Sequence, residues 1–175
     1  MPSFDLSKVW DTLPELATLH IQNLDSFNKE QFLQVYRRLT LYVGLQTLNL
    51  ELVGFELEEV KNELIEIFRI HGDFLKHLSL ARNKVTNEFL KFISLELRGI
   101  FNVLESVDLR HLKELQKVNF VELLQAIALL NERTASTKRD KPLRVYLSDY
   151  QTQLRRGQIF KYLETAQPEL ELHFD

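Results

Sequence analysis

Four residues have types and spacings that could support nucleophilic catalysis. His77 and Ser79 stand on one strand-like segment, and Ser106 and Asp108 stand on the next such segment. On neighbouring strands, spaced by about 4.8 Å, these side chains could meet as a Ser-His-Asp arrangement. A triad also needs an oxyanion hole and a pocket that excludes water, which an open sheet surface does not offer. We therefore assign no catalytic residue and expect a protein that is not an enzyme.

Metal and cofactor chemistry find little support in the sequence. There is no cysteine, which excludes thiol nucleophiles, disulfides and Cys-ligated metals. No glycine-rich loop follows any strand-like segment, so a phosphate-binding turn is not expected. The five histidines form no i, i+4 pair typical of a metal site, and we expect them at the surface or in turns: His20, His71, His77, His111 and His173. We expect neither a metal nor a cofactor.

A repeat explains the leucine content, which is 34 of 175 residues. The pattern L-x-x-L-x-L begins at Leu16, Leu45, Leu75 and Leu104, with spacings of 29, 30 and 29 residues. Two less regular copies are Pro142-Val145-Leu147 and Gln167-Leu170-Leu172. Such self-similarity at a fixed period is typical of repeat architectures.

Each repeat predicts a strand followed by a helix. The last positions of each copy alternate apolar and polar residues, and the segments that follow have helical spacing. We expect Asp25 or Ser26 to cap the first helix and Thr86 to cap the third, with further helices near residues 120–130 and 153–165. The polar positions between the strand leucines predict an α/β fold with a parallel sheet that is covered by helices on one face only.

On these copies the chain resembles the leucine-rich-repeat family, in its long-repeat, ribonuclease-inhibitor-like subclass, over residues 13–174. The resemblance implies a solenoid with a curved parallel sheet on the concave side and helices on the convex side. It implies a single domain of about five to six repeats over residues 1–175, and the amphipathic residues 1–13 would form an N-terminal capping helix. The family's asparagine after the strand is matched by Asn83, while Leu24, Val53, Leu112 and Tyr150 replace it elsewhere.

The resemblance implies a non-catalytic module that binds another protein, as one subunit of a larger complex. The expected contact residues on the concave face are His20, Asn49, His77, Ser79, Asp108, Arg110 and Tyr146. A merely solvated sheet face remains the alternative for the same residues. The uncapped last strand, which includes Leu170 and Leu172, offers an edge for a dimer or complex contact.

A basic region supports a second hypothesis, a nucleic-acid-associated adaptor. Residues 131–142 form an expected inserted loop, and residues 131–161 carry eight basic and three acidic residues. The patch comprises Arg133, Lys138, Arg139, Lys141, Arg144, Arg155 and Arg156. The overall pI of about 6.0 and the absence of interleaved exposed aromatic residues argue against nucleic acid, and such charge runs are usually solvated faces. Without a membrane-length apolar run or a signal-peptide pattern, we expect an intracellular protein, cytoplasmic or nuclear.

Overall fold

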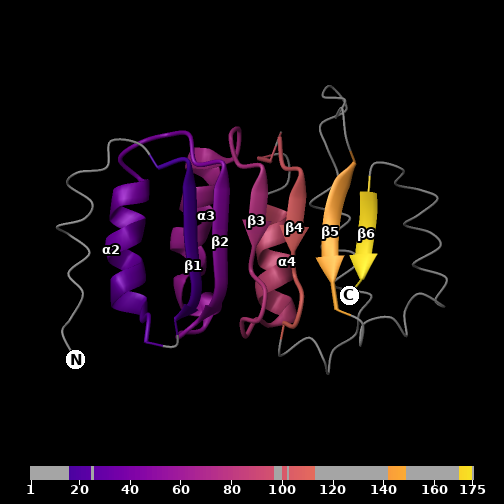
Figure 1. The fold of residues 1–175 in the computed structure, drawn as a ribbon. Coiled ribbons are helices and arrows are strands. Elements are labelled where there is room, and N and C mark those ends of the chain that lie inside the picture. The colour runs from indigo at the N-terminus through magenta and orange to yellow at the C-terminus, as the bar shows by residue number, and fades with distance from the viewer. Residues whose placement is uncertain are drawn as a thin grey trace.

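A computed structural model describes residues 16–24, 26–96, 100–101, 103–112, 142–148 and 170–174. The predicted capping helix in residues 1–13, the inserted loop up to residue 141 and the predicted helices near 120–130 and 153–165 lie outside them. The structure contains a six-stranded parallel sheet in which each strand pairs with the next one along the chain (Figure 1). The strands are β1 (Thr18–Leu24), β2 (Thr47–Val53), β3 (His77–Ser79), β4 (Ser106–Asp108), β5 (Leu143–Leu147) and β6 (Leu170–Phe174).

The described helices pack on one face of this sheet (Figure 1). They are α2 (Lys29–Leu39), the short 3-10 helix η1 (Leu57–Val60), α3 (Lys61–His71) and α4 (Asn87–Glu96). The predicted α/β class, with helices on one face of a parallel sheet, is confirmed. We call the opposite face, which no described helix covers, the open face. The sheet is not strongly curled, so the expected curved, concave sheet is not confirmed (Figure 1).

The helix starts follow local hydrogen bonding. Thr86 caps α4 as predicted, since its hydroxyl accepts a hydrogen bond from the backbone N–H of Phe89 at 3.1 Å. The prediction for α2 was wrong, because its cap is Asn28. The Asn28 carboxamide and the Gln31 side chain each accept a hydrogen bond from the other's backbone N–H at 3.0 Å, which makes a capping box.

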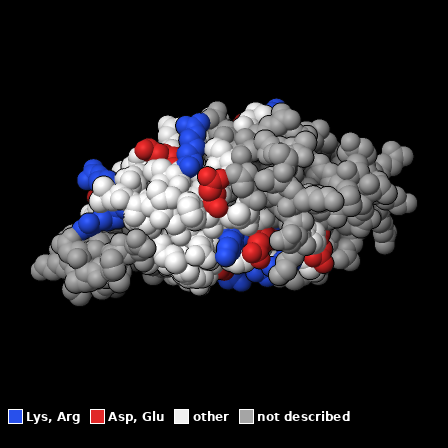
Figure 2. All heavy atoms as spheres, turned by 90° about the horizontal axis from the view of Figure 1, so that it is seen from above, with Lys and Arg blue, Asp and Glu red and all other residues white. Residues whose placement is uncertain are grey.

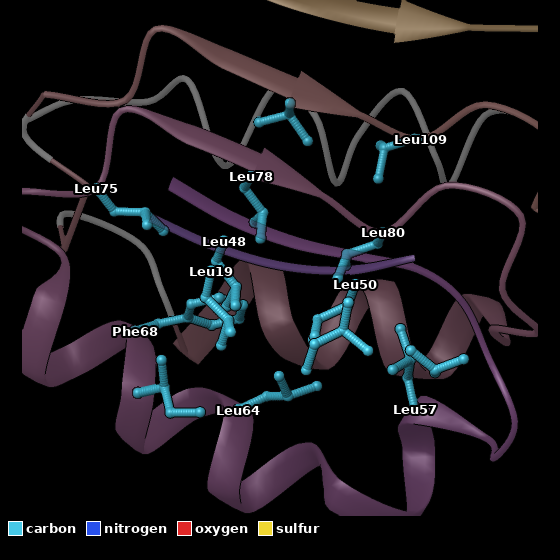
Figure 3. Close-up of a cluster of buried hydrophobic side chains, with 14 of the residues drawn as sticks. Leu19, Leu48, Leu50, Leu57, Leu64, Phe68, Leu75, Leu78, Leu80 and Leu109 are labelled. Carbon is cyan, nitrogen blue, oxygen red and sulfur yellow. The ribbon is translucent and has the colours of Figure 1, made fainter. Parts of the chain in front are cut away.

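The strand leucines point into a single core between the sheet and the helices (Figure 3). Leu48, Leu50 and Leu80 are buried, and they pack with side chains such as Leu64 and Phe68 of α3. Each fully buried leucine contributes about 1.5 to 3 kcal/mol through removal of apolar surface from water. The excess of leucine in the sequence therefore has a packing cause.

A left-handed turn recurs at the end of the first four strands. Asn23, Leu52, Arg82 and His111 all have positive φ values, between 51° and 61°. Their spacings of 29, 30 and 29 residues equal those of the leucine motif. This conformation costs a non-glycine residue about 1 to 2 kcal/mol. Its recurrence in four unlike residue types shows that the position in the repeat, rather than the residue, imposes it.

Asn83 joins two of these turns. Its buried carboxamide accepts a hydrogen bond from Val53 N–H at 3.0 Å and donates to the carbonyls of Leu80, at 3.0 Å, and of Leu50. These bonds satisfy backbone groups that would otherwise be buried without partners. At the equivalent positions of other repeats, Val53 and Leu112 are buried apolar side chains.

The sixth copy is placed differently from the prediction. The strand register pairs Val145 with Leu172 and Leu147 with Phe174. Leu172 and Phe174 therefore occupy the positions that the motif assigned to Leu170 and Leu172, a shift of two residues. A shift of two keeps the same side chains on the same face, so the alternation of apolar and polar residues could not reveal it.

Candidate functional site

Two rows of polar side chains cross the open face. The strand register aligns residues of one row as Thr18, Thr47, His77, Ser106, Arg144 and Glu171. It aligns the second row as His20, Asn49, Ser79, Asp108, Tyr146 and His173. The predicted contact residues therefore do share one surface, and Arg110 follows β4 at its edge. Ser79 is the exception in accessibility, because it is only 8% exposed.

A small hollow of about 220 Å³ lies in the middle of this face. We call it the central hollow; its walls include Asn49, His77, Ser106, Asp108 and Tyr146. It is smaller than ordinary small-molecule sites, which span about 300 to 1,000 Å³. Its size suits a side chain rather than a cofactor.

Ser106 and His77 form a hydrogen-bonded pair at the wall of the central hollow. Ser106 Oγ lies 2.9 Å from His77 Nδ1, across the β3–β4 pairing. Asp108 is held instead by Arg110, whose Nε and Nη2 donate to its two carboxylate oxygens at 2.9 and 2.7 Å. The three residue types of a triad thus share one face, while the carboxylate orients an arginine rather than the histidine.

Asn49 has an unsatisfied acceptor. Its Oδ1 is buried and has no hydrogen-bond partner among the described residues. A buried polar atom without a partner costs about 1 to 3 kcal/mol. Because this oxygen is closed to solvent, the missing bond is a cost to the folded chain and not a contact that a ligand in the hollow can reach.

A stack of three side chains lies beside the central hollow. The Arg110 guanidinium carbon is 5.7 Å from the centroid of the Tyr146 ring, and the Tyr146 and His173 rings stack at 5.0 Å with 24° between their planes. We call Arg110, Tyr146 and His173 the aromatic stack. His173 Nε2 is also 3.5 Å from a carboxylate oxygen of Glu171. Sequence reasoning missed His173 as a site residue, and the signal that would have found it is the alternation Leu172-His173-Phe174.

Charges on the open face are mostly paired with opposite charges. Besides Asp108 and Arg110, the Arg144 guanidinium lies 3.9 Å from the Glu105 carboxylate. Of the predicted basic patch, only Arg144 is described; the others, outside the described residues, are Arg133, Lys138, Arg139, Lys141, Arg155 and Arg156. Figure 2 views the molecule from above Figure 1, along the strands rather than onto the open face, and there too basic and acidic side chains are interspersed over the described atoms.

His71 is fully buried, so its expected place at the surface or in a turn was wrong. Its Nδ1 accepts hydrogen bonds from the backbone N–H groups of Gly44 and Leu45 at 3.3 and 3.2 Å, and its Nε2 donates to the carbonyl of Leu39 at 2.9 Å. Burial lowers the pKa of His71 from its ordinary value of 6.5, against an opposing effect of the Leu39 hydrogen bond. The neutral ring joins the end of α3 to the segment that leads into β2.

Among the described residues, no three His, Asp or Glu side chains gather closely enough to hold a metal ion. No helix in the same part of the chain is both long and apolar enough to cross a membrane. Comparison with protein-family models, with curated proteins and with solved structures finds no match for this chain. The function must therefore be argued from the chain's own geometry.

Proposed function

We propose that the chain is a divergent leucine-rich-repeat solenoid that acts as a non-catalytic protein-binding module, one subunit of a larger complex. The open face is the binding surface. The repeat assignment is supported by the sequential strand order, the aligned core leucines and the left-handed residue at the same position of four copies. Asn83 supports it further, because its carboxamide bonds the turns of two neighbouring repeats.

The observation that carries the binding proposal is the aromatic stack on the open face. Arginine and tyrosine are enriched among residues that dominate the energy of protein interfaces. Here Asp108 orients Arg110, and Arg110 and His173 both contact Tyr146, so three strands position one partly exposed ring. A ring that is held in place before binding loses little conformational entropy when a partner covers it.

The paired charges define the kind of partner. Asp108 with Arg110, and Arg144 with Glu105, leave the described open face without an excess of either sign. A strongly basic or acidic partner, including nucleic acid, would gain little long-range attraction from such a surface. The partner is a protein surface with polar and aromatic groups.

The test is quantitative affinity purification with the intact chain and with Tyr146→Ala or Arg110→Ala. Both substitutions are expected to reduce the recovered amount of the same protein partner by about tenfold or more, which is the scale of hot-spot residues. Matched controls are Phe74→Ala, an exposed aromatic residue in the loop before β3, and Arg37→Ala, an exposed arginine on α2. Retention of every partner by folded Tyr146→Ala protein would contradict the proposal.

A second contact is proposed at β6, which stands last in the strand order. Among the described residues, β6 has a neighbouring strand on one side only, and such an edge can accept a strand of another chain. The mass in solution tests this contact by light scattering over a wide range of concentration. A second copy would give a dimer that dissociates on dilution. A chain that stays monomeric at every concentration and binds no hydrophobic dye would count against the contact.

A further inference from the structure

We propose that His173 is a proton-dependent clamp, whose charged ring in mild acid fixes Tyr146 and strengthens partner binding at the open face. The proposal rests on the binding function proposed above and adds the regulation of that surface. Its starting point is a line of five side chains in contact, which runs from the end of β4 to β6. In order, they are Asp108, Arg110, Tyr146, His173 and Glu171.

The two ends of this line differ in how their carboxylates are paired. At the β4 end, Arg110 is always charged, and it donates to the two carboxylate oxygens of Asp108 at 2.9 and 2.7 Å. At the β6 end, His173 Nε2 lies 3.5 Å from a carboxylate oxygen of Glu171 but has no hydrogen-bond partner among the described residues. Histidine is the side chain that changes charge between about pH 5 and 8. A proton on His173 therefore gives the β6 end the carboxylate–cation pair that the β4 end already has.

Protonation adds two attractions to the His173 ring. The imidazolium carries an N–H on both nitrogens, so Nε2 becomes a donor to the Glu171 carboxylate whichever nitrogen held the proton before. The charged ring also lies 5.0 Å from the centroid of the Tyr146 ring, which is within the range of cation–π attraction. Each attraction strengthens the contact by about 2- to 5-fold at a partly exposed site.

The other charged groups of the open face oppose this proton only weakly. Those near His173, on β6, β5 and the end of β4 in turn, are Glu171, Arg144, Asp108 and Arg110. The Arg144 guanidinium lies 3.9 Å from the Glu105 carboxylate, and the charge of Arg110 is compensated by its own ion pair. The His173 side chain is also 38% exposed, so water screens a charge on its ring.

The clamp connects proton binding to the two proposed contacts. Among the described residues, β6 pairs with β5 alone, so its attachment to the sheet depends on cross-strand contacts such as the one between Tyr146 and His173. A more firmly attached β6 holds Tyr146 in place, which lowers the entropy that a partner loses on binding. Partner binding at the open face should therefore strengthen as the pH falls from about 7.5 to about 5.5.

The test is amide hydrogen exchange of the whole chain, followed by NMR at about pH 7.5 and about pH 5.5. The β6 amides report local opening of that strand, whereas the β2 amides, in a strand that is paired on both sides, report changes in the rest of the sheet. After correction for the intrinsic pH dependence of exchange, the protection of β6 relative to β2 is expected to rise by about 3- to 10-fold at the lower pH.

Three variants and one control make the exchange measurement specific. His173→Gln and Glu171→Gln should each lose most of the rise, because the first takes up no proton and the second offers no carboxylate. His173→Arg carries a permanent charge that can stack on Tyr146, so it should keep the high relative protection of β6 at both pH values. The control is His20→Gln, an exposed histidine of the same row on β1, which should behave as the natural chain.

The clamp would be overturned by a natural chain without the rise, or by a rise that persists in His173→Gln. Because the readout is a ratio between two pH values in one protein, a uniform loss of stability in a variant does not imitate it. The exchange measurement needs no partner. Its failure is therefore distinct from retention of the partner by Tyr146→Ala, which would contradict the proposed function.

Discussion

Tyr146 on β5 and His173 on β6 stack with their ring centroids 5.0 Å apart, directly opposite each other in the strand register. The stack connects the last strand to the centre of the open face, since Arg110 contacts the same tyrosine from the end of β4. A partner that binds at β6 would therefore contact the residues that position Tyr146. The two proposed contacts, the open face and the β6 edge, are physically joined.

Replacement of His173 with alanine should weaken this stack. We expect a loss of about 0.5 to 1.5 kcal/mol in unfolding free energy, the usual scale for an aromatic pair. Urea denaturation measures it. The control is His20→Ala, an exposed histidine of the same row on β1, which should change stability by less than about 0.5 kcal/mol. Equal effects of the two substitutions would show that the stacking contributes nothing.

Asn83→Leu tests the bridge between the turns after β2 and β3. The substitution introduces the residue that stands at position 112 of the next repeat, so its size fits the architecture. It leaves Val53 N–H and the carbonyls of Leu50 and Leu80 without their side-chain partner. We expect a loss of about 3 kcal/mol or more, since three groups lose a partner and each buried unpaired group costs about 1 to 3 kcal/mol. A loss below about 1 kcal/mol would mean that water or a backbone shift replaces these bonds.

Much of the fold followed from the spacing of a few residues. Leu45, Leu75 and Leu104 placed three strands in their correct order, because leucines at a fixed period must face one core. The parallel sheet and its five to six strands were predicted from the copies of the motif, and the helix after Thr86 was predicted from its cap. These signals are local, so the sequence carries them directly.

The remaining features depend on contacts between distant residues. The place of His71 depends on backbone groups of residues 39, 44 and 45, which its helix meets only in the folded chain. The place of His173 depends on the strand register, and a shift of two residues leaves the alternation of apolar and polar residues unchanged. The orphaned Asn49 oxygen likewise depends on the packing around it. The pairing of Asp108 with Arg110 is local, but it depends on side-chain conformations that the sequence pattern does not specify.

Leucines inside and outside the core should respond differently to truncation. Leu80 is 2% exposed and packs between the sheet and the helices, whereas Leu41, in the loop before β2, is 73% exposed. We expect Leu80→Ala to cost about 2 to 5 kcal/mol, because it removes buried surface and leaves a cavity. Leu41→Ala should stay within about 0.5 kcal/mol. Denaturant unfolding of the two variants checks this, and a large loss for Leu41→Ala would mean that its side chain is covered in solution.

His71 should make the protein less stable in mild acid. Burial lowers the pKa of the folded ring below its ordinary 6.5, so the unfolded chain binds the proton more readily than the folded one. Stability is therefore fully present above the unfolded pKa, and it is lost as the pH falls through 6.5 toward the folded pKa. A proton on Nδ1 would also displace the hydrogen bonds from the N–H groups of Gly44 and Leu45. Between about pH 8 and 5, the urea midpoint should decrease as the pH is lowered, in the natural chain and in His20→Gln. In His71→Gln most of this pH dependence should disappear. An unchanged slope in His71→Gln would assign the acid sensitivity to another group.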